Sequence, residues 1–228
     1  GSKWYADVLE NVESEGDDYG KTDTLKGQKI MVEFVSANPT GPMHMGNARG
    51  GVLGDALASV MDRAGYDVWR EFYVNDAGNQ IEKFACSLEA RYLQIIHGEE
   101  NVPFPEDGYH GDDIKEMAKL IVEQDGNKWV DVAADERRQA FVEFGLPRNI
   151  ERMKRDLARY RVNFDNWFLE SSLHKSGYVA ETIQLLTDAG LTYEKDGAIW
   201  LKNTELGADK DEVMRRSNGF YTYYAVDI

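Results

Sequence analysis

The stretch that decides the fold is KIMVEFV, residues 29–35, followed directly by SANPTGPMHMGN, residues 36–47. The first part is short, apolar and rich in β-branched side chains, so we predict a buried strand there. The second part holds two prolines and two glycines in twelve residues, which excludes regular structure through most of it. A buried strand that runs into a long irregular loop is therefore expected.

Helical periodicity begins after this loop. Gly65 is suited to follow the helix, because glycine adopts the left-handed backbone conformation that ends many helices. Residues 67–74 then alternate like a strand, and residues 77–97 again look helical. Strand, glycine-containing loop, helix and strand in this order are typical of a parallel α/β sheet. The side chains expected to form the buried stripe of the first helix are Val52, Leu53, Ala56, Leu57, Val60, Met61 and Ala64.

Further along the chain the pattern changes, and we expect four regions. Residues 1–26 are a polar, acidic leader that is the remnant of an N-terminal region, and residues 27–98 form the first half of the parallel-sheet domain. Residues 99–190 are expected to be a mainly helical insertion. Residues 191–228 turn strand-like again and return into the sheet domain, with strands expected at 198–201 and 221–228. Because the pattern stops at Ile228 without a turn, we expect a truncated domain.

Composition excludes several classes of protein. No apolar run approaches the length of about 18 residues that a membrane span needs. The net charge of −15 argues against a general nucleic-acid coat, which needs clustered positive charge. A single cysteine, Cys86, excludes a disulfide framework and is expected in the core of a protein from a reducing compartment. The histidines carry no metal-ligand spacing, so no metal site is expected.

The loop at 36–47 is the best candidate for chemistry. It leads to the N-terminus of a helix, where free backbone N–H groups and the helix dipole favour an anion. Gly41 and Gly46 allow a ligand to approach the backbone closely, and His44 adds a polar side chain at the same place. From these residues alone, an ordinary strand–helix loop with a surface histidine remains an equal alternative.

The amino-acid sequences of three segments resemble those of one known family. EFVSANPTGPMHMGN, residues 33–47, resembles the His-Ile-Gly-His signature of class I aminoacyl-tRNA synthetases. Its flanking residues, together with EFYVNDAGNQ at 71–80 and GFYTYYAVDI at 219–228, are similar to the arginyl-tRNA synthetases in particular. The resemblance implies an α/β fold, namely a truncated Rossmann-like nucleotide-binding domain of class I with a mainly helical connective insertion.

The resemblance also implies an activity, that of a cytoplasmic arginine–tRNA ligase. ATP, accompanied by Mg²⁺, would activate L-arginine to arginyl-adenylate, and the arginyl group would pass to tRNA(Arg); no membrane is involved. The sequence departs from the family because Asn47 replaces the second signature histidine and no Lys-Met-Ser-Lys-Ser-like block is present. We therefore expect this chain alone to be inactive. Two alternatives stay open: a fragment that only binds arginine or ATP, and a small nucleotidyltransferase with the same histidine signature.

The resemblance assigns site residues by position. It implies catalytic roles for His44 and Asn47, and ATP binding by Pro42, His44, Gly46 and Asn47. It implies arginine binding by Glu33, Ser36, Asn38, His44, Tyr223 and Asp227. Carboxylates suit the planar guanidinium of arginine, and a carboxylate in the segment expected to be buried is expensive without a partner.

One charged feature stands apart from the net acidity. Four arginines fall at i, i+4, i+7 and i+11 of a helix expected to begin at Pro147, and they are Arg148, Arg152, Arg155 and Arg159. The opposite, buried stripe is expected to consist of Ile150, Met153, Leu157 and Tyr160. The arginines are either a solvated face or a contact with the acceptor end of tRNA.

Overall fold

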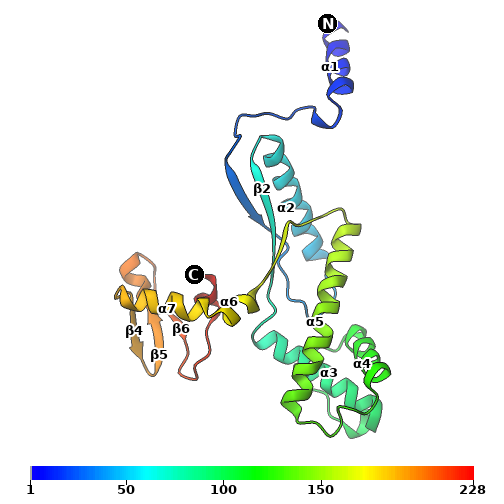
Figure 1. Cartoon of the computed structure of the whole chain (residues 1–228), viewed down its shortest axis with the longest axis vertical. Helices are drawn as coiled ribbons and strands as arrows, with labels where there is room; N and C mark the ends of the chain where they lie inside the picture. The colour runs from blue at the N-terminus through cyan, green and yellow to red at the C-terminus, as the bar shows by residue number, and fades with distance from the viewer. Residues whose placement is uncertain (1) are drawn as a thin grey trace. The chain divides into compact units, whose positions relative to one another are not determined.

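The computed structural model describes residues 2–228, which form two compact units (Figure 1). Unit 1 comprises residues 2–74 and 78–168, and unit 2 comprises Asn75–Ala77 and Leu169–Ile228. Each unit has its own sheet and its own buried cluster of apolar side chains. No helix within residues 2–228 combines the length and the apolar character needed to cross a membrane.

Unit 1 begins with a helix that packs into no core. The helix α1 (Ser2–Glu15) and the following short turn η1 (Gly16–Asp18) contain no buried residue. The chain is then tied to the end of α2 (Met45–Arg63), because the Arg63 guanidinium donates to the Tyr19 carbonyl over 2.8 Å.

The sheet of unit 1 confirms the predicted order of strand, loop, helix and strand. Strand β1 (Lys29–Glu33) pairs in parallel with β2 (Asp67–Val74), and β3 (Asn166–Leu169) completes the order β1-β2-β3. The prediction that residues 29–35 form a buried strand is wrong in two respects. The strand ends at Glu33, because positive φ angles at Val35 and Ser36 turn the chain, and its side chains alternate between exposed and half-buried.

Helix α2 follows the loop and ends before Gly65, as predicted, but it buries a different face. Gly51, Gly54 and Ala58 are its buried residues, and the position of a Cβ atom on Gly54 would lie 2.2 Å from Cγ of Phe34. The small residues allow the helix to lie directly on Phe34. The predicted apolar stripe is therefore mostly exposed, with Leu53 at 73% and Val60 at 68%.

Three longer helices form the rest of unit 1. They are α3 (Asn79–His97), α4 (Asp112–Asp125) and α5 (Ala134–Arg159), with the short η2 (Glu99–Asn101) after α3. The first two pack with the first half of α5 around Tyr92, Phe141 and Ile121. The second half of α5 packs with the sheet through Met153 and Leu157. The prediction that this helix begins at Pro147 is wrong, because the helix already begins at Ala134, more than three turns earlier, and carries the proline in its interior.

Unit 2 contains two short helices, an antiparallel sheet and a terminal helical turn. The elements are α6 (Glu170–Ser176), α7 (Tyr178–Asp188), β4 (Thr192–Lys195), β5 (Ala198–Leu201), η3 (Asn203–Leu206), β6 (Glu212–Arg215) and α8 (Tyr223–Asp227). Asp196 and Gly197, both with positive φ, form the tight β4–β5 turn, which suits the twist of a hairpin. The strand predicted at 198–201 is confirmed. The strand predicted at 221–228 is wrong, because Thr222 caps a helix by accepting from the Ala225 N–H.

Candidate functional site

A strained turn delivers the loop from the end of β1. Val35 and Ser36 have φ angles of 68° and 37°, a region that non-glycine residues occupy at a cost of about 1–3 kcal/mol. The Ser36 hydroxyl holds the turn, since it donates to Oε1 of Glu33 over 2.7 Å and accepts from the Tyr73 N–H over 3.2 Å. These two bonds connect the loop to both parallel strands.

His44 is the N-cap of α2, and its ring folds back over the first turn. Its Nδ1 atom accepts from the Gly46 N–H over 3.1 Å. Because Nδ1 accepts, the neutral ring carries its proton on Nε2, which remains a donor. The position of a Cβ atom at residue 46 would lie 2.9 Å from Cε1 of His44, so glycine is required for this ring position.

Asn47 completes the cap from the other side. Its Oδ1 atom accepts from the His44 N–H over 2.9 Å, which gives a reciprocal capping box at the start of α2. With the oxygen used in this way, the Nδ2 group is left to donate outwards. The expectation of free N–H groups at this helix start is wrong for Gly46, Asn47 and Ala48, whose N–H groups all bond to His44.

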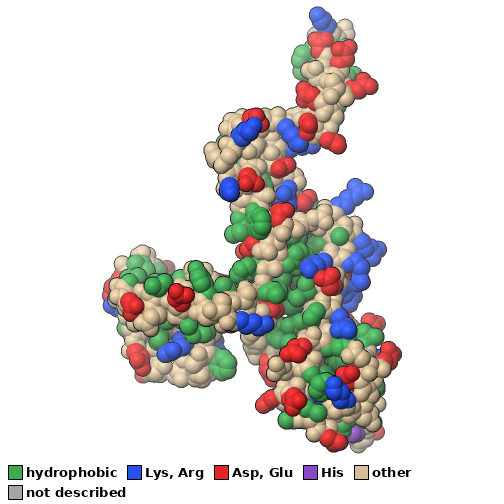
Figure 2. Space-filling model, viewed as in Figure 1, with side chains coloured by type: hydrophobic (Ala, Val, Ile, Leu, Met, Phe, Trp, Pro, Cys, Tyr) green, Lys and Arg blue, Asp and Glu red, His purple; other side chains and the backbone are tan. Residues whose placement is uncertain are grey.

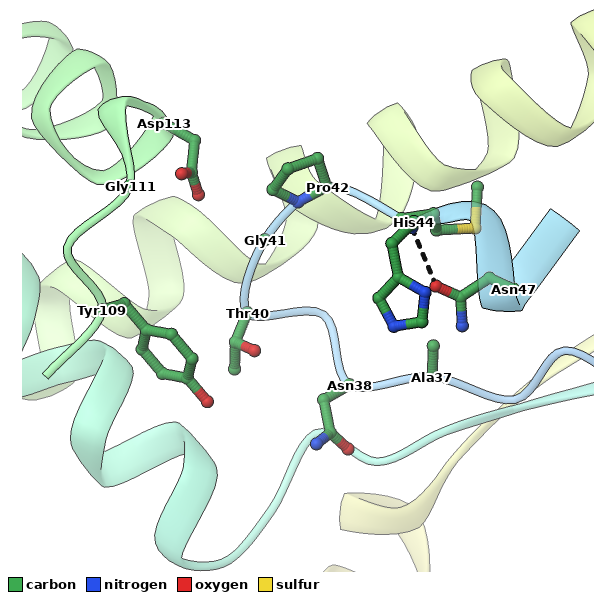
Figure 3. Close-up of a pocket in the computed structure, with 11 residues that line it drawn as sticks. Ala37, Asn38, Thr40, Gly41, Pro42, His44, Asn47, Tyr109, Gly111 and Asp113 are labelled. Carbon is green, nitrogen blue, oxygen red and sulfur yellow. Dashed lines mark hydrogen bonds between the residues drawn. The ribbon is translucent and has the colours of Figure 1, made fainter. Parts of the chain in front are cut away.

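A cavity of about 430 Å³ lies beside this cap (Figure 3). Asn38, Pro42, His44 and Asn47 line it from the loop, so four of the predicted site residues share one wall. Gly46 does not line the cavity but fixes the His44 ring that does. A cavity of this size with a few polar groups is typical of small-molecule sites.

The opposite wall comes from a segment that the sequence patterns did not single out. Tyr109, Gly111 and Asp113 precede or begin α4 and face the loop (Figure 3). The Tyr109 hydroxyl donates to Oε1 of Gln80 at the start of α3. The position of a Cβ atom on Gly41 would lie 3.3 Å from the Asp113 carboxylate. The signal in the sequence was weak: a polar run with two glycines that follows Pro103 and Pro105 and precedes a helical stretch.

The arginine-binding candidates are not assembled in one unit. Glu33 and Ser36 are hydrogen-bonded at the end of β1 in unit 1, and the expectation that Glu33 is buried is wrong because its side chain is exposed. Tyr223 and Asp227 lie in unit 2, where both are exposed at the two ends of α8. Their spacing of four residues puts them on the same side of this helix.

Other titratable groups lie outside this cavity. Within residues 2–228, no group of three or more His, Cys, Asp and Glu side chains is arranged to hold a metal ion. Cys86, expected in the core, is half-buried and contacts Oε1 of Glu82 at 3.5 Å. Burial raises the pKa of its thiol, so it is a poor nucleophile.

A parallel strand–helix–strand unit with His-x-Gly at the helix start is the arrangement expected of a class I aminoacyl-tRNA synthetase catalytic domain, although the histidine signature alone is shared with small nucleotidyltransferases. Solved structures support this class. A Campylobacter jejuni structure named for an arginyl-tRNA synthetase has a TM-score of 0.85 and 32% identity, over 97% of this chain and 48% of that chain. Arginyl-tRNA synthetase of Thermus thermophilus has the same fold at 22% identity, with a TM-score of 0.63 over 96% of this chain and 38% of that one.

Sequence comparison narrows the class to one family. The family model described as tRNA synthetases class I (R), catalytic domain, matches residues 9–228. Arginine–tRNA ligase of Acetivibrio thermocellus is 58% identical over 99% of this chain and 40% of its own length. The ligase of Ruminiclostridium cellulolyticum is 59% identical over 95% of this chain and 38% of its own length. The chain belongs to the arginyl-tRNA synthetase family and spans about 40% of the length of these relatives.

Proposed function

We propose that the 228-residue chain is part of an arginine–tRNA ligase. Its loop at 36–47 would provide the ATP-binding loop of that enzyme. The observation that carries the proposal is the capping box of His44 and Asn47, two residues that line the 430 Å³ cavity and each keep a side-chain donor that the cap does not use. In the proposed reaction, a carboxylate oxygen of arginine attacks the α-phosphorus of ATP and pyrophosphate leaves. The terminal ribose hydroxyl of tRNA(Arg) then attacks the arginyl carbonyl, and AMP leaves.

The loop would act by stabilising charge rather than by forming bonds. Nε2–H of His44 and Nδ2–H of Asn47 would donate to phosphate oxygens, and the positive end of the α2 dipole would add to their effect. Pro42 would form the wall beside them, while Gly46 keeps the histidine ring in place. Because backbone N–H groups of this turn are already used, we assign the phosphate contacts to the side chains.

Magnesium would reach this site with the nucleotide. Mg²⁺ commonly keeps several waters and is bound through substrate phosphates plus one or two carboxylates. Among the described residues no carboxylate cluster is arranged to hold it alone, and Asp113 is the carboxylate that lines the cavity. When bound, the ion would neutralise phosphate charge.

Arginine would be selected by carboxylates. Glu33 and Asp227 would accept from the guanidinium, and Tyr223 would flank it, since a planar fork of donors needs such partners. Ser36 and Asn38 would hold the α-amino and carboxylate end, close to His44. Oε1 of Glu33 already accepts from Ser36, which leaves Oε2 for the ligand.

A second candidate is binding without turnover by the 228-residue chain alone. The observation that favours it is the span of about 40% of the related ligases together with the missing lysine-containing block. Membership of the arginyl family leaves the small nucleotidyltransferase without support. For the whole protein we propose a cytoplasmic location, where ATP and tRNA are available.

The test is formation of aminoacyl-tRNA by the full-length protein, offered each amino acid with ATP and total tRNA. We expect a product with arginine only, and none from the 228-residue chain. His44→Ala should lower the rate about 100- to 1,000-fold, which is the usual effect of losing one preorganised donor to developing charge. Charging with another amino acid, or a loss of less than about threefold in His44→Ala, contradicts the proposal.

A further inference from the structure

Four arginines form a row along the outer side of α5, and we call this row the arginine stripe. Its members are Arg148, Arg152, Arg155 and Arg159. At 1.5 Å per residue the stripe extends for about 16 Å. Figure 2 shows Lys and Arg side chains gathered over the C-terminal half of this helix. A continuous basic row is unexpected on a chain with a net charge of −15.

Most of this positive charge is not neutralised by neighbours. Arg152 approaches Asp156 only to 3.9 Å, between Nε and Oδ2. Cζ of Arg148 lies 3.5 Å from the centre of the Phe144 ring, and Nη1 of Arg148 donates to the Phe144 carbonyl over 2.7 Å. These contacts orient the guanidinium without neutralising its charge. Arg155 and Arg159 are exposed and form no ion pair within the part of the chain that the structure describes.

The stripe is also held in a fixed position relative to the signature loop. Asn149, the neighbour of Arg148, is buried, and its Nδ2 donates to the Pro39 carbonyl over 2.8 Å. Met153 and Leu157 pack in the same cluster as Phe34 and Phe72. The stripe therefore starts at the helical turn that contacts the loop and continues away from it.

We propose that the arginine stripe binds the sugar–phosphate backbone of the tRNA acceptor arm and guides its 3′ end towards the loop at 36–47. This inference rests on the proposed function, which requires that end to reach the ATP site. A row of guanidinium groups suits a chain of phosphates better than it suits a single small anion. An acidic protein is the rival partner and would leave RNA affinity independent of the stripe.

The experiment compares two sets of four substitutions in the full-length protein. Both sets remove four positive charges, so they change the net charge equally, and all the positions except the half-buried Arg152 are exposed. The stripe variant is Arg148→Gln, Arg152→Gln, Arg155→Gln and Arg159→Gln. The matched control is Lys3→Gln, Lys119→Gln, Lys195→Gln and Lys210→Gln. Fluorescence anisotropy measures the affinity of each protein for a labelled hairpin RNA with the acceptor-arm sequence and a single-stranded 3′ end, across a range of salt concentrations.

We expect the stripe variant to bind this RNA about tenfold more weakly or worse, and its slope of log affinity against log salt to become shallower by about 3, because each lost phosphate contact contributes about 0.7–0.9. The control should keep the slope of the unmodified protein. A third variant with lysine at the four stripe positions should keep most of the slope, since lysine also neutralises phosphates. Arginine and ATP affinities should not change in any variant.

Equal slopes in the stripe variant and the control would overturn the proposal, as would a lysine variant that behaves like the glutamine variant. Far-UV circular dichroism and thermal melting check that each variant is folded. The readout is independent of the proposed activity. If the protein charges tRNA with arginine but the stripe variant keeps its RNA slope, only the stripe proposal is refuted. If the protein fails to charge arginine but the slopes of stripe variant and control still differ, the proposed function is refuted and RNA binding by the stripe remains, without its role in guiding the 3′ end.

Discussion

His44 lies over its own helix because residue 46 has no side chain. The ring occupies the space that a Cβ atom would need, and Nδ1 accepts from the N–H of that glycine. The sequence motif predicted a shared site for His44, Gly46 and Asn47, and the structure brings the three residues into contact at the start of α2. It could not predict that the Asn47 oxygen closes the cap, because that depends on the φ and ψ angles of residues 44–47. Two functions, capping and donation outwards, therefore meet in one asparagine amide.

Asn47→Asp separates these two functions. The carboxylate can still accept from the His44 N–H, and a negative charge near a helix N-terminus stabilises it by about 0.3–1 kcal/mol. The outward donor is lost and a negative charge replaces it, so ATP affinity should fall about tenfold or more. Calorimetric titration with ATP and thermal melting measure the two effects.

Asn47→Ala is the matched control, because it removes both the acceptor and the donor. It should lower the melting temperature as well as the affinity for ATP. If Asn47→Asp binds ATP as well as the unmodified protein does, the Asn47 amide does not contact the nucleotide.

Helix α2 illustrates what periodicity cannot decide at the scale of an element. Its start after the proline-containing loop and its end before Gly65 were predictable, because local backbone restrictions set both. The buried face was not, since large apolar residues and small residues both recur at helical spacing. Close approach to Phe34 selects the small face. In α8, likewise, a cap by Thr222 overrides the strand-like composition of residues 221–228.

Gly54→Ala tests the close packing of α2 on the strand end. The added methyl group would overlap Cγ of Phe34, so the helix or the ring must shift, and overpacking of this kind costs about 1–3 kcal/mol. Because the packing is weakened, the amides of α2 and β1 should exchange hydrogen faster than in the unmodified protein, and hydrogen-exchange measurements check this.

Gly50→Ala in the same helix is the control. A Cβ atom there would meet nothing within 4 Å, and alanine should stabilise the helix by about 0.5–1 kcal/mol. Equal protection in both variants would mean that α2 does not depend on the close contact with Phe34.

At the scale of the whole molecule, the two units divide the candidate substrate contacts. The ATP-binding candidates and Glu33 belong to unit 1, whereas Tyr223 and Asp227 belong to unit 2. The order of the three family-like segments was visible in the sequence and predicted the family. Their distribution between units was not visible, because it depends on which side chains pack together. The 109–113 wall of the cavity was missed for the same reason, since it meets the loop only in the folded chain.

The central claim is that one set of residues binds the nucleotide and a separate pair of carboxylates selects arginine. Calorimetric titration of arginine, lysine and ATP into the full-length protein and its Asp227→Ala variant tests it most directly. Asp209→Ala, an exposed change of equal charge in unit 2, is the control. We expect Asp227→Ala to weaken arginine binding about 10- to 100-fold and to narrow the preference over lysine, with ATP affinity unchanged. Equal losses for arginine and ATP, or the same loss of arginine affinity in the control, would contradict the claim.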